Sequence, residues 1–189
     1  MIIAMIRHGE TDYNKKQLVQ GRMDNPLNSE GIHQAETLGT YLRDNNETFD
    51  VLISSPLKRA LKTAEIVGSY IGLQVNYTDK NLLERDFGPF EGKSIDEVLP
   101  IITLDDFRKD GFEDNPSLQS RILSAVQRIS NLHSHQKVLI VAHAHVIKSL
   151  IILSNKDKFT YTNHFVGNSS IVYFKITDDT VEVIKQYDL

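Results

Sequence analysis

Three short, almost uninterrupted apolar runs stand out along the chain, each followed at once by polar residues. They cover residues 2–6, 50–54 and 138–142. Apolar runs of this length without polar alternation are typical of strands whose two faces are both buried. Three further strands are predicted at residues 74–77, 170–175 and 181–186, the last two separated by a turn at Asp178-Asp179.

Segments in which apolar residues recur with helical spacing connect these strands. The predicted helices begin at Asn28 or Ser29, at Pro56, at Pro116 or Ser117, and directly after His143. The first should end near residues 44–46, and Gly72 should end the second. Residues 81–115 are less regular and carry several glycines and prolines, which predicts a side wall or lid at residues 84–115.

The alternation of strands and helices predicts a three-layer α/β/α sandwich around a central sheet. A chain of 189 residues with 40% hydrophobic content can form one core that buries roughly 70% of the surface of the unfolded chain. The sequence shows no internal repeat, low-complexity tract or linker. We therefore expect residues 1–189 to form a single domain.

Composition excludes several classes of function. The chain contains no cysteine, which excludes disulfides, cysteine-ligated metals and phosphatases with a thiolate nucleophile. Its formal net charge of −4 provides no field that would attract nucleic acid or an anionic membrane. The first apolar run ends at Arg7, too early for a signal peptide, and no other run approaches a membrane span. We therefore expect a cytoplasmic protein in which any anion-binding site is built locally.

Arginine and histidine side chains follow the three buried strands. Arg7 and His8 come directly after the first, Arg59 lies in the first turn of the helix after the second, and His143 follows the third. Ligands of open α/β sheets bind beyond the carboxyl ends of the strands, and a helix N-terminus favours an anion. Two guanidinium groups and two imidazoles at one sheet edge would suit phosphoryl transfer. Taken singly, these residues have ordinary alternatives: a solvated turn, a solvated helix face or a buried structural histidine.

The order and spacing of several motifs resemble the histidine phosphatase superfamily, the phosphoglycerate-mutase-like proteins, over nearly the whole chain. The matching segments are Arg7-His8-Gly9-Glu10-Thr11 with Asn14, residues 20–28 with Gly31 and Gln34-Ala35, residues 54–60 with Thr63-Ala64, Leu83-Glu84 with Gly88 and Glu91-Gly92, and Val141-Ala142-His143. The resemblance implies a phosphoglycerate-mutase-like fold with a mostly parallel, mixed sheet. It also implies a histidine acid-type phosphatase, which hydrolyses a small-molecule phosphomonoester through a phosphohistidine without metal or cofactor. The expected state is a monomer or homodimer.

The resemblance also assigns roles to residues. It implies that His8 is the nucleophile, that Glu84 is the proton donor, and that the phosphate pocket is formed by Arg7, Arg59 and His143. The other residues expected at the substrate are Asn14, Gln20, Gly21 and Ala144.

Elementary chemistry supports these roles. Nearby guanidinium charge lowers the pKa of an imidazole, which keeps a ring nitrogen of His8 free to attack at pH 7. Fixed donors from Arg7, Arg59 and a protonated His143 would stabilise the charge of the transition state, so no metal is required. Glu84 would donate a proton to the leaving alkoxide, with a neighbouring phosphate dianion favouring its protonated form, and would later accept a proton from water.

Two positions depart from the family pattern. The usual Gly after the second histidine is replaced by Ala144, followed by His145, so a methyl group enters the pocket wall. The Glu-Ser of the family's side wall appears as Glu113-Asp114, at the expected distance before Arg121. The resemblance therefore does not determine the pocket geometry at Ala144 or the contacts of this side wall.

Two alternatives concern other kinds of site. The triplet His143-Ala144-His145 could suggest a metallohydrolase, but neighbours in a strand-to-helix turn point apart, and Arg7 would repel a cation. A non-catalytic module that only binds a phosphorylated ligand would need neither the nucleophile His8 nor the proton donor Glu84.

The third alternative is a phosphoglycerate mutase. In the family, that activity uses a longer, arginine-bearing insertion after Glu-Gly, which this chain lacks. Acidic residues outnumber basic ones between Lys93 and Asn115, so this segment is a poor host for further anionic groups. The pattern favours a phosphatase for substrates with one main phosphate, although Arg22, Arg85 or Arg108 could meet a second charge.

Overall fold

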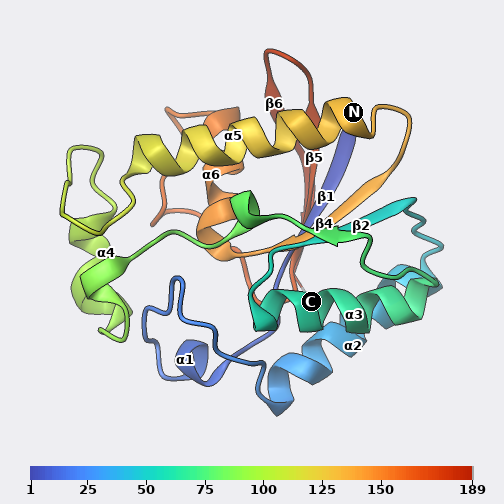
Figure 1. Ribbon diagram of the computed structural model, residues 1–189, viewed down its shortest axis with the longest axis horizontal. Coiled ribbons are helices and arrows are strands. Elements are labelled where there is room, and N and C mark those ends of the chain that lie inside the picture. The colour runs from blue at the N-terminus through green and yellow to red at the C-terminus, as the bar shows by residue number, and fades with distance from the viewer. Residues whose placement is uncertain (189) are drawn as a thin grey trace.

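A six-stranded sheet forms the centre of the molecule, which is described for residues 1–188 by a computed structural model (Figure 1). Its strands are β1 (Ile2–Arg7), β2 (Val51–Ser54), β3 (Tyr77–Thr78), β4 (Val138–Ala142), β5 (Ile171–Ile176) and β6 (Val181–Tyr187), in the order β3-β2-β4-β1-β5-β6. The first four of that order are parallel, whereas β5 is antiparallel to both of its neighbours. The carboxyl ends of β1, β2 and β4 therefore meet at one edge of the sheet.

Helices cover both faces of the sheet. Helices α5 (Asn115–Leu132) and α6 (Ala144–Ser154) pack on one face, and α2 (Ser29–Asp44) and α3 (Lys58–Ile71) pack on the other, along the lower side of Figure 1. Two shorter helices, α1 (Asp12–Lys15) and α4 (Ile95–Ile102), and two 3₁₀ turns, Lys80–Leu82 and Gly88–Phe90, lie in the connections. The predicted three-layer α/β/α fold with a mostly parallel, mixed sheet is confirmed.

The apolar run of β1 contributes to two separate parts of the core. Ile3 and Met5 belong to a cluster with the buried faces of α5 and α6, whereas Ala4 and Ile6 belong to a cluster with α2 and α3. All four are at most 1% exposed. Because successive side chains of a strand point to opposite faces, a strand covered on both sides must be apolar throughout. This is the physical reason for the uninterrupted runs in the sequence.

Most element boundaries agree with the pattern of the sequence, with small shifts. Helix α3 begins at Lys58 rather than Pro56 and ends, as predicted, where Gly72 adopts a left-handed φ of 72°. Helix α5 begins at Asn115 because the Asp114 side chain caps it, accepting from the backbone of Ser117 at 2.8 Å. Strand β3 contains only two residues.

Two helices occur where none was predicted. Helix α4 includes Pro100, which the sequence analysis treated as punctuation. Proline removes one backbone donor, but Val98 and Ile102 are buried in a small cluster with Val19 and Phe87, and this packing holds the short helix in place. Helix α1 is a single turn stabilised by a capping box at Thr11.

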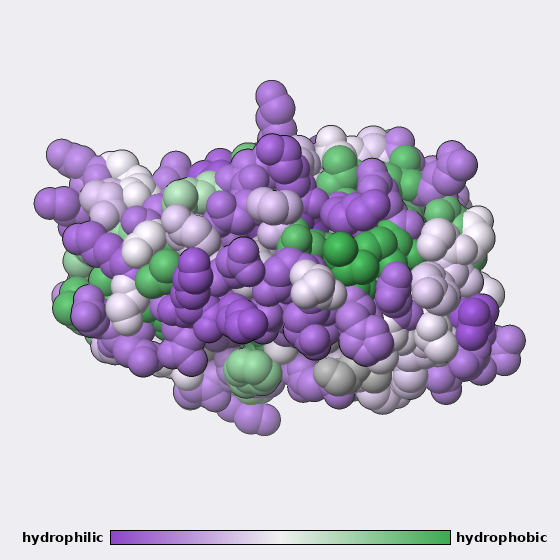
Figure 2. Space-filling view, turned by 90° about the horizontal axis from the view of Figure 1, so that it is seen from below, coloured by the Kyte–Doolittle hydropathy of each residue, from purple (hydrophilic) through white to green (hydrophobic). Residues whose placement is uncertain are grey.

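The outer surface is largely polar. Seen from below, hydrophilic side chains cover most of the molecule around a compact hydrophobic area (Figure 2). Within residues 1–188, no helix combines the length and apolar character that a membrane crossing requires.

Candidate active site

A cavity of about 230 Å³ opens beyond the carboxyl ends of the parallel strands. Its lining includes eight of the residues predicted from the sequence, namely Arg7, His8, Asn14, Gln20, Gly21, Arg59, Glu84 and Ala144. The ninth, His143, lies behind the lining, with its ring centroid 5.2 Å from that of His8. The structure thus brings together side chains that lie up to 137 positions apart, because each follows a strand or loop that ends at this edge.

His8 is held in one orientation and in its neutral form. Its Nδ1 lies 2.7 Å from the carbonyl oxygen of Gly9, which accepts the ring proton, and Arg59 Nε donates to Nε2 at 3.2 Å. Burial lowers the pKa of His8 well below its usual value, and the charges of Arg59 and Arg7 lower it further. The lone pair therefore resides on Nε2, the nitrogen that a nucleophilic role requires.

Two guanidinium groups share this cavity, that of the buried Arg59 and that of the half-buried Arg7. Arg59 donates to the carbonyl oxygens of Met23 at 2.6 Å and Gly21 at 2.7 Å, and Arg7 donates to that of Val166 at 2.6 Å. Burial lowers the pKa of each arginine to about 10, with the Glu84 carboxylate acting in the opposite direction. Among the described residues, Arg7 Nε is buried and has no hydrogen-bond partner. An arginine pair held by carbonyl dipoles leaves positive charge available to an anionic ligand.

Glu84 lines the cavity from the loop after Lys80–Leu82. Its carboxylate accepts from the backbone of Arg85 at 2.8 Å and from the backbone of His145 at 3.2 Å. The second bond places it at the N-terminus of α6, where the helix dipole favours an acidic group. Glu84 is 6% exposed, so its carboxyl group is fixed beside the cavity.

Two residues to which the sequence assigned no role, Glu113 and Arg121, hold the segment that contains Glu84. Arg121 binds Glu113 with two bonds of 2.7 and 2.8 Å, and donates to the carbonyl oxygens of Asn81 at 2.7 Å and Leu83 at 2.9 Å. These contacts fix the backbone directly before Glu84. The side-wall position Glu113 therefore acts through Arg121 and does not line the cavity.

His143 differs from its expected protonation state. It is fully buried, its Nε2 lies 2.7 Å from Ser55 Oγ, and burial together with Arg59, His8 and Arg7 lowers its pKa well below the usual value. In the free site His143 is neutral rather than protonated. The reason is that two arginines already occupy this water-excluded edge, and a third positive charge there is costly without an anion.

Asn14 and Gln20 present amide groups at the mouth of the cavity. Asn14 Oδ1 accepts from the Thr11 backbone at 3.1 Å, and Gln20 Oε1 accepts from Thr11 Oγ1 at 3.1 Å. Because their oxygens are used within the protein, their NH₂ groups are the ends that can face a phosphate. Thr11 thus fixes the shape of the segment that follows His8.

Gly9 lies where two backbones approach each other. It has no positive φ, so its backbone conformation is open to other residues. A Cβ atom at Gly9, however, would stand 2.3 Å from the carbonyl oxygen of Gly31 in α2. The position requires glycine because two backbones approach closely beside His8.

Several cavity residues were not identified from the sequence. Apolar side chains form much of the wall, namely Leu18, Val19, Phe87, Ile95, Leu99, Phe165 and Val166. Lys148 of α6 adds an amine. The sequence places Lys148 on the helix that follows His143, which brings it near the site. Whether its amine points into the cavity depends on the loop that packs against that helix.

The three arginines considered for a second anionic group do not line the cavity. Arg22 donates to the Glu84 carbonyl at 2.7 Å, Arg85 is fully buried and donates to Asn115 at 2.8 Å, and Arg108 pairs with Asp114 at 2.9 Å. Each has a structural contact that uses its guanidinium group.

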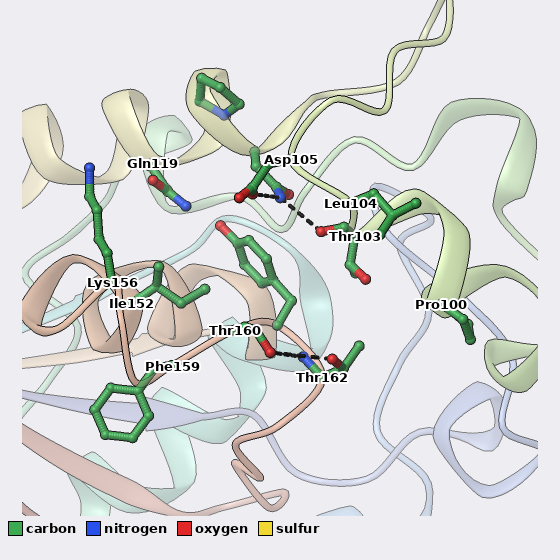
Figure 3. Close-up of a pocket in the computed structure, with 13 residues that line it drawn as sticks. Pro100, Thr103, Leu104, Asp105, Gln119, Ile152, Lys156, Phe159, Thr160 and Thr162 are labelled. Carbon is green, nitrogen blue, oxygen red and sulfur yellow. Dashed lines mark hydrogen bonds between the residues drawn. The ribbon is translucent and has the colours of Figure 1, made fainter.

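A second, larger cavity of about 610 Å³ lies between the end of α4, the start of α5 and residues 156–162 (Figure 3). Tyr161 lines it together with Gln119 and Thr160, which lie at the upper and lower sides of the cavity in this view. The Tyr161 ring also stacks on His145, which lines the first cavity, at a centroid distance of 4.8 Å. None of the residues predicted for catalysis lines this second cavity.

The two histidines of the triplet point apart, as expected. His143 faces Ser55 and His8, whereas His145 packs between Tyr161 and Phe87. Within the described part of the chain, no three acidic or histidine side chains are grouped in a way that could hold a metal ion.

Comparison with known proteins gives a consistent result. The sequence profile of the "Histidine phosphatase superfamily (branch 1)" matches residues 3–188. The chain is 36% identical over 149 residues to the "Uncharacterized phosphatase PhoE" of Bacillus subtilis, covering 79% of this chain and 75% of that protein. It is 34% identical over 158 residues to phosphoglycerate mutase-like protein 4 of Arabidopsis thaliana, covering 78% and 68%.

Among solved structures, the fold is similar to that of phosphoserine phosphatase from Entamoeba histolytica in complex with 3-phosphoglyceric acid. The TM-score is 0.81 at 25% identity, and the match covers 100% of this chain and 97% of that one.

Proposed function

Because the chain belongs to the histidine phosphatase superfamily, we propose that it hydrolyses phosphomonoesters of small metabolites through a phosphohistidine at His8, without a metal ion. The observation that carries this proposal is the state of His8. The neutral imidazole donates its Nδ1 proton in a hydrogen bond to a carbonyl oxygen, and its Nε2 meets Arg59. Neither Arg59 nor Arg7, which lines the same cavity, has a carboxylate partner among the described residues. Such a site provides a nucleophile and an anion pocket at once.

In the first step, the Nε2 lone pair of His8 forms a bond to phosphorus while the bond from phosphorus to the ester oxygen breaks. Arg59, which now donates to Nε2, would turn that donor to a phosphoryl oxygen, alongside Arg7. Glu84 gives its proton to the leaving alkoxide. The bond from His8 Nδ1 to the Gly9 carbonyl stabilises the positive ring that results.

In the second step, the Glu84 carboxylate takes a proton from water as the water oxygen bonds to phosphorus and the bond to Nε2 breaks. Inorganic phosphate leaves, and His8 and Glu84 return to their starting states. A phosphate dianion in the pocket would favour the protonated form of His143, which then adds a third donor.

The acid-type classification is part of the proposal. Burial, Arg59 and Arg7 lower the pKa of His8, so the nucleophile stays neutral well into the acidic range. The neutral state of His8 supports activity at pH values below neutrality.

Hydrolysis is favoured over mutase activity by the shape and charge of the cavity. It is small and mostly apolar beyond the phosphate pocket, and none of Arg22, Arg85 and Arg108 reaches it. Similarity to proteins named as phosphatases and to the Entamoeba enzyme bound to 3-phosphoglyceric acid supports a small phosphorylated metabolite as substrate.

The test is hydrolysis of an aryl phosphate by the wild type and by His8→Ala, with and without a chelator. Activity that resists the chelator and disappears in His8→Ala supports the proposal. Activity that the chelator removes, or that survives in His8→Ala, would overturn it. Incubation with 2- and 3-phosphoglycerate distinguishes hydrolysis, which releases phosphate, from interconversion of the two isomers.

A further inference from the structure

Lys148 places an amine in the catalytic cavity that the proposed mechanism does not use. It lines the same cavity as Arg7 and Glu84, and its Nζ donates to the backbone carbonyl of Tyr161 at 2.7 Å. No carboxylate within residues 1–188 forms an ion pair with it. This half-buried ammonium is bound by one neutral carbonyl oxygen, and no acidic side chain neutralises its charge.

Lys148 lies on α6 and shares the cavity with both Arg7 and Glu84. The helix begins after His143, and the backbone of His145 in its first turn binds Glu84. Lys148 lies about one turn further, or roughly 5 Å along the helix axis. Since Glu84 would serve the leaving alcohol and lines the same cavity as Lys148, an anionic group on that alcohol would share the cavity with the amine.

The lowered pKa of Lys148 also favours an anionic partner. Burial and the charge of Arg7 lower the pKa of Lys148 to about 8, with Glu84 opposing them. The protein therefore keeps this ammonium in an environment that disfavours its charge. An anionic group of a bound molecule would remove that cost.

We infer that Lys148 selects substrates whose leaving alcohol carries a carboxylate. A single amine matches the single charge of a carboxylate better than a second phosphate, which carries about two charges. The cavity volume of about 230 Å³ also favours the smaller group. This inference rests on the proposed phosphatase function and specifies the class of its substrate.

The experiment compares substrates that differ by one charge. The probes are phosphoglycolate, 3-phosphooxypropanoate and 4-phosphooxybutanoate, each paired with its own primary amide. For the wild type, we expect kcat/KM to favour the acid over the amide by about tenfold or more at the best chain length. Lys148→Met should reduce that ratio to near one while kcat/KM for the amides stays within about threefold, and Lys148→Arg should keep part of the preference.

Lys156→Met is the matched control. Lys156 lies just past the end of α6 and lines the second cavity (Figure 3), so its removal should leave the ratio unchanged. Equal rates for acid and amide in the wild type, or equal losses on both in Lys148→Met, would overturn the inference. Failure of the wild type to hydrolyse any of the six compounds or an aryl phosphate would instead contradict the proposed function itself.

Discussion

Replacement of Glu84 by glutamine separates acid catalysis from binding. The substitution keeps the shape of the side chain and removes its ability to donate and accept a proton. General acid catalysis contributes about 10²- to 10⁴-fold. We expect a loss of that size in kcat/KM for alkyl phosphates, whose alkoxides cannot leave without a proton, and a much smaller loss for aryl phosphates with acidic phenols.

The structure also indicates how much folding stability Glu84→Gln should lose. Both carboxylate oxygens of Glu84 accept from backbone donors, from Arg85 and His145, whereas glutamine has only one acceptor oxygen. One buried N–H loses its partner, which costs about 1–3 kcal/mol of stability. This cost is independent of the substrate and cannot produce a dependence on the leaving group.

Glu91→Gln is the matched control. The Glu91 carboxylate also accepts from two backbone donors, Arg22 at 2.5 Å and Met23 at 3.1 Å, but it does not line the cavity. The assay plots kcat/KM against the pKa of the leaving alcohol for the wild type and both variants. Glu84→Gln should give a steeper line than the wild type and Glu91→Gln a parallel one. Parallel lines for both variants would refute the assignment of Glu84 as the acid.

Three further predictions concern stability and positioning. The buried histidines His8, His143 and His145 should make the protein less stable in acid. As pH drops below about 6.5, the unfolded chain binds a proton at each of them while the folded chain, with lowered pKa values, does not, so the free energy of unfolding should fall by about 1.4 kcal/mol per pH unit for each histidine. Urea titrations at several pH values check this, and a flat profile would contradict it. Gly9→Ala should destabilise the protein by about 1–3 kcal/mol and reduce kcat, because the new methyl group meets the carbonyl oxygen of Gly31, and unchanged thermal unfolding would show that the two backbones can separate freely. Arg121→Met should slow turnover of alkyl phosphates more than aryl phosphates, since it releases the backbone at Leu83 that holds Glu84; a uniform loss on both would indicate only a damaged fold.

The strands and the positions that follow them were predictable from the sequence. Burial on both faces imposes uninterrupted apolar runs, and the carboxyl ends of parallel strands converge whatever the intervening loops do. This is why Arg7, His8, Arg59 and His143 could be expected near one another. Their motif spacing then indicated the family.

Features that depend on packing between distant loops were not predictable. Helix α4 is stabilised by a small apolar cluster that overrides the breaking tendency of Pro100. The amine of Lys148 is directed by a carbonyl of the loop that contains Tyr161, and no local pattern encodes that contact. The neutral state of His143 likewise follows from its complete burial and from the nearby charges of Arg59 and Arg7, neither of which can be read from the sequence.

The most direct test of the proposed mechanism is to trap the intermediate. The wild type is mixed with a ³²P-labelled phosphomonoester, quenched in alkali within the first turnover, and the labelled peptide is identified by mass spectrometry. We predict up to one phosphoryl group per active site, stable in base and labile in acid, attached to Nε2 of His8 and missing in His8→Ala. Label on any other residue, or rapid turnover with no label at all, would contradict a phosphohistidine at this position.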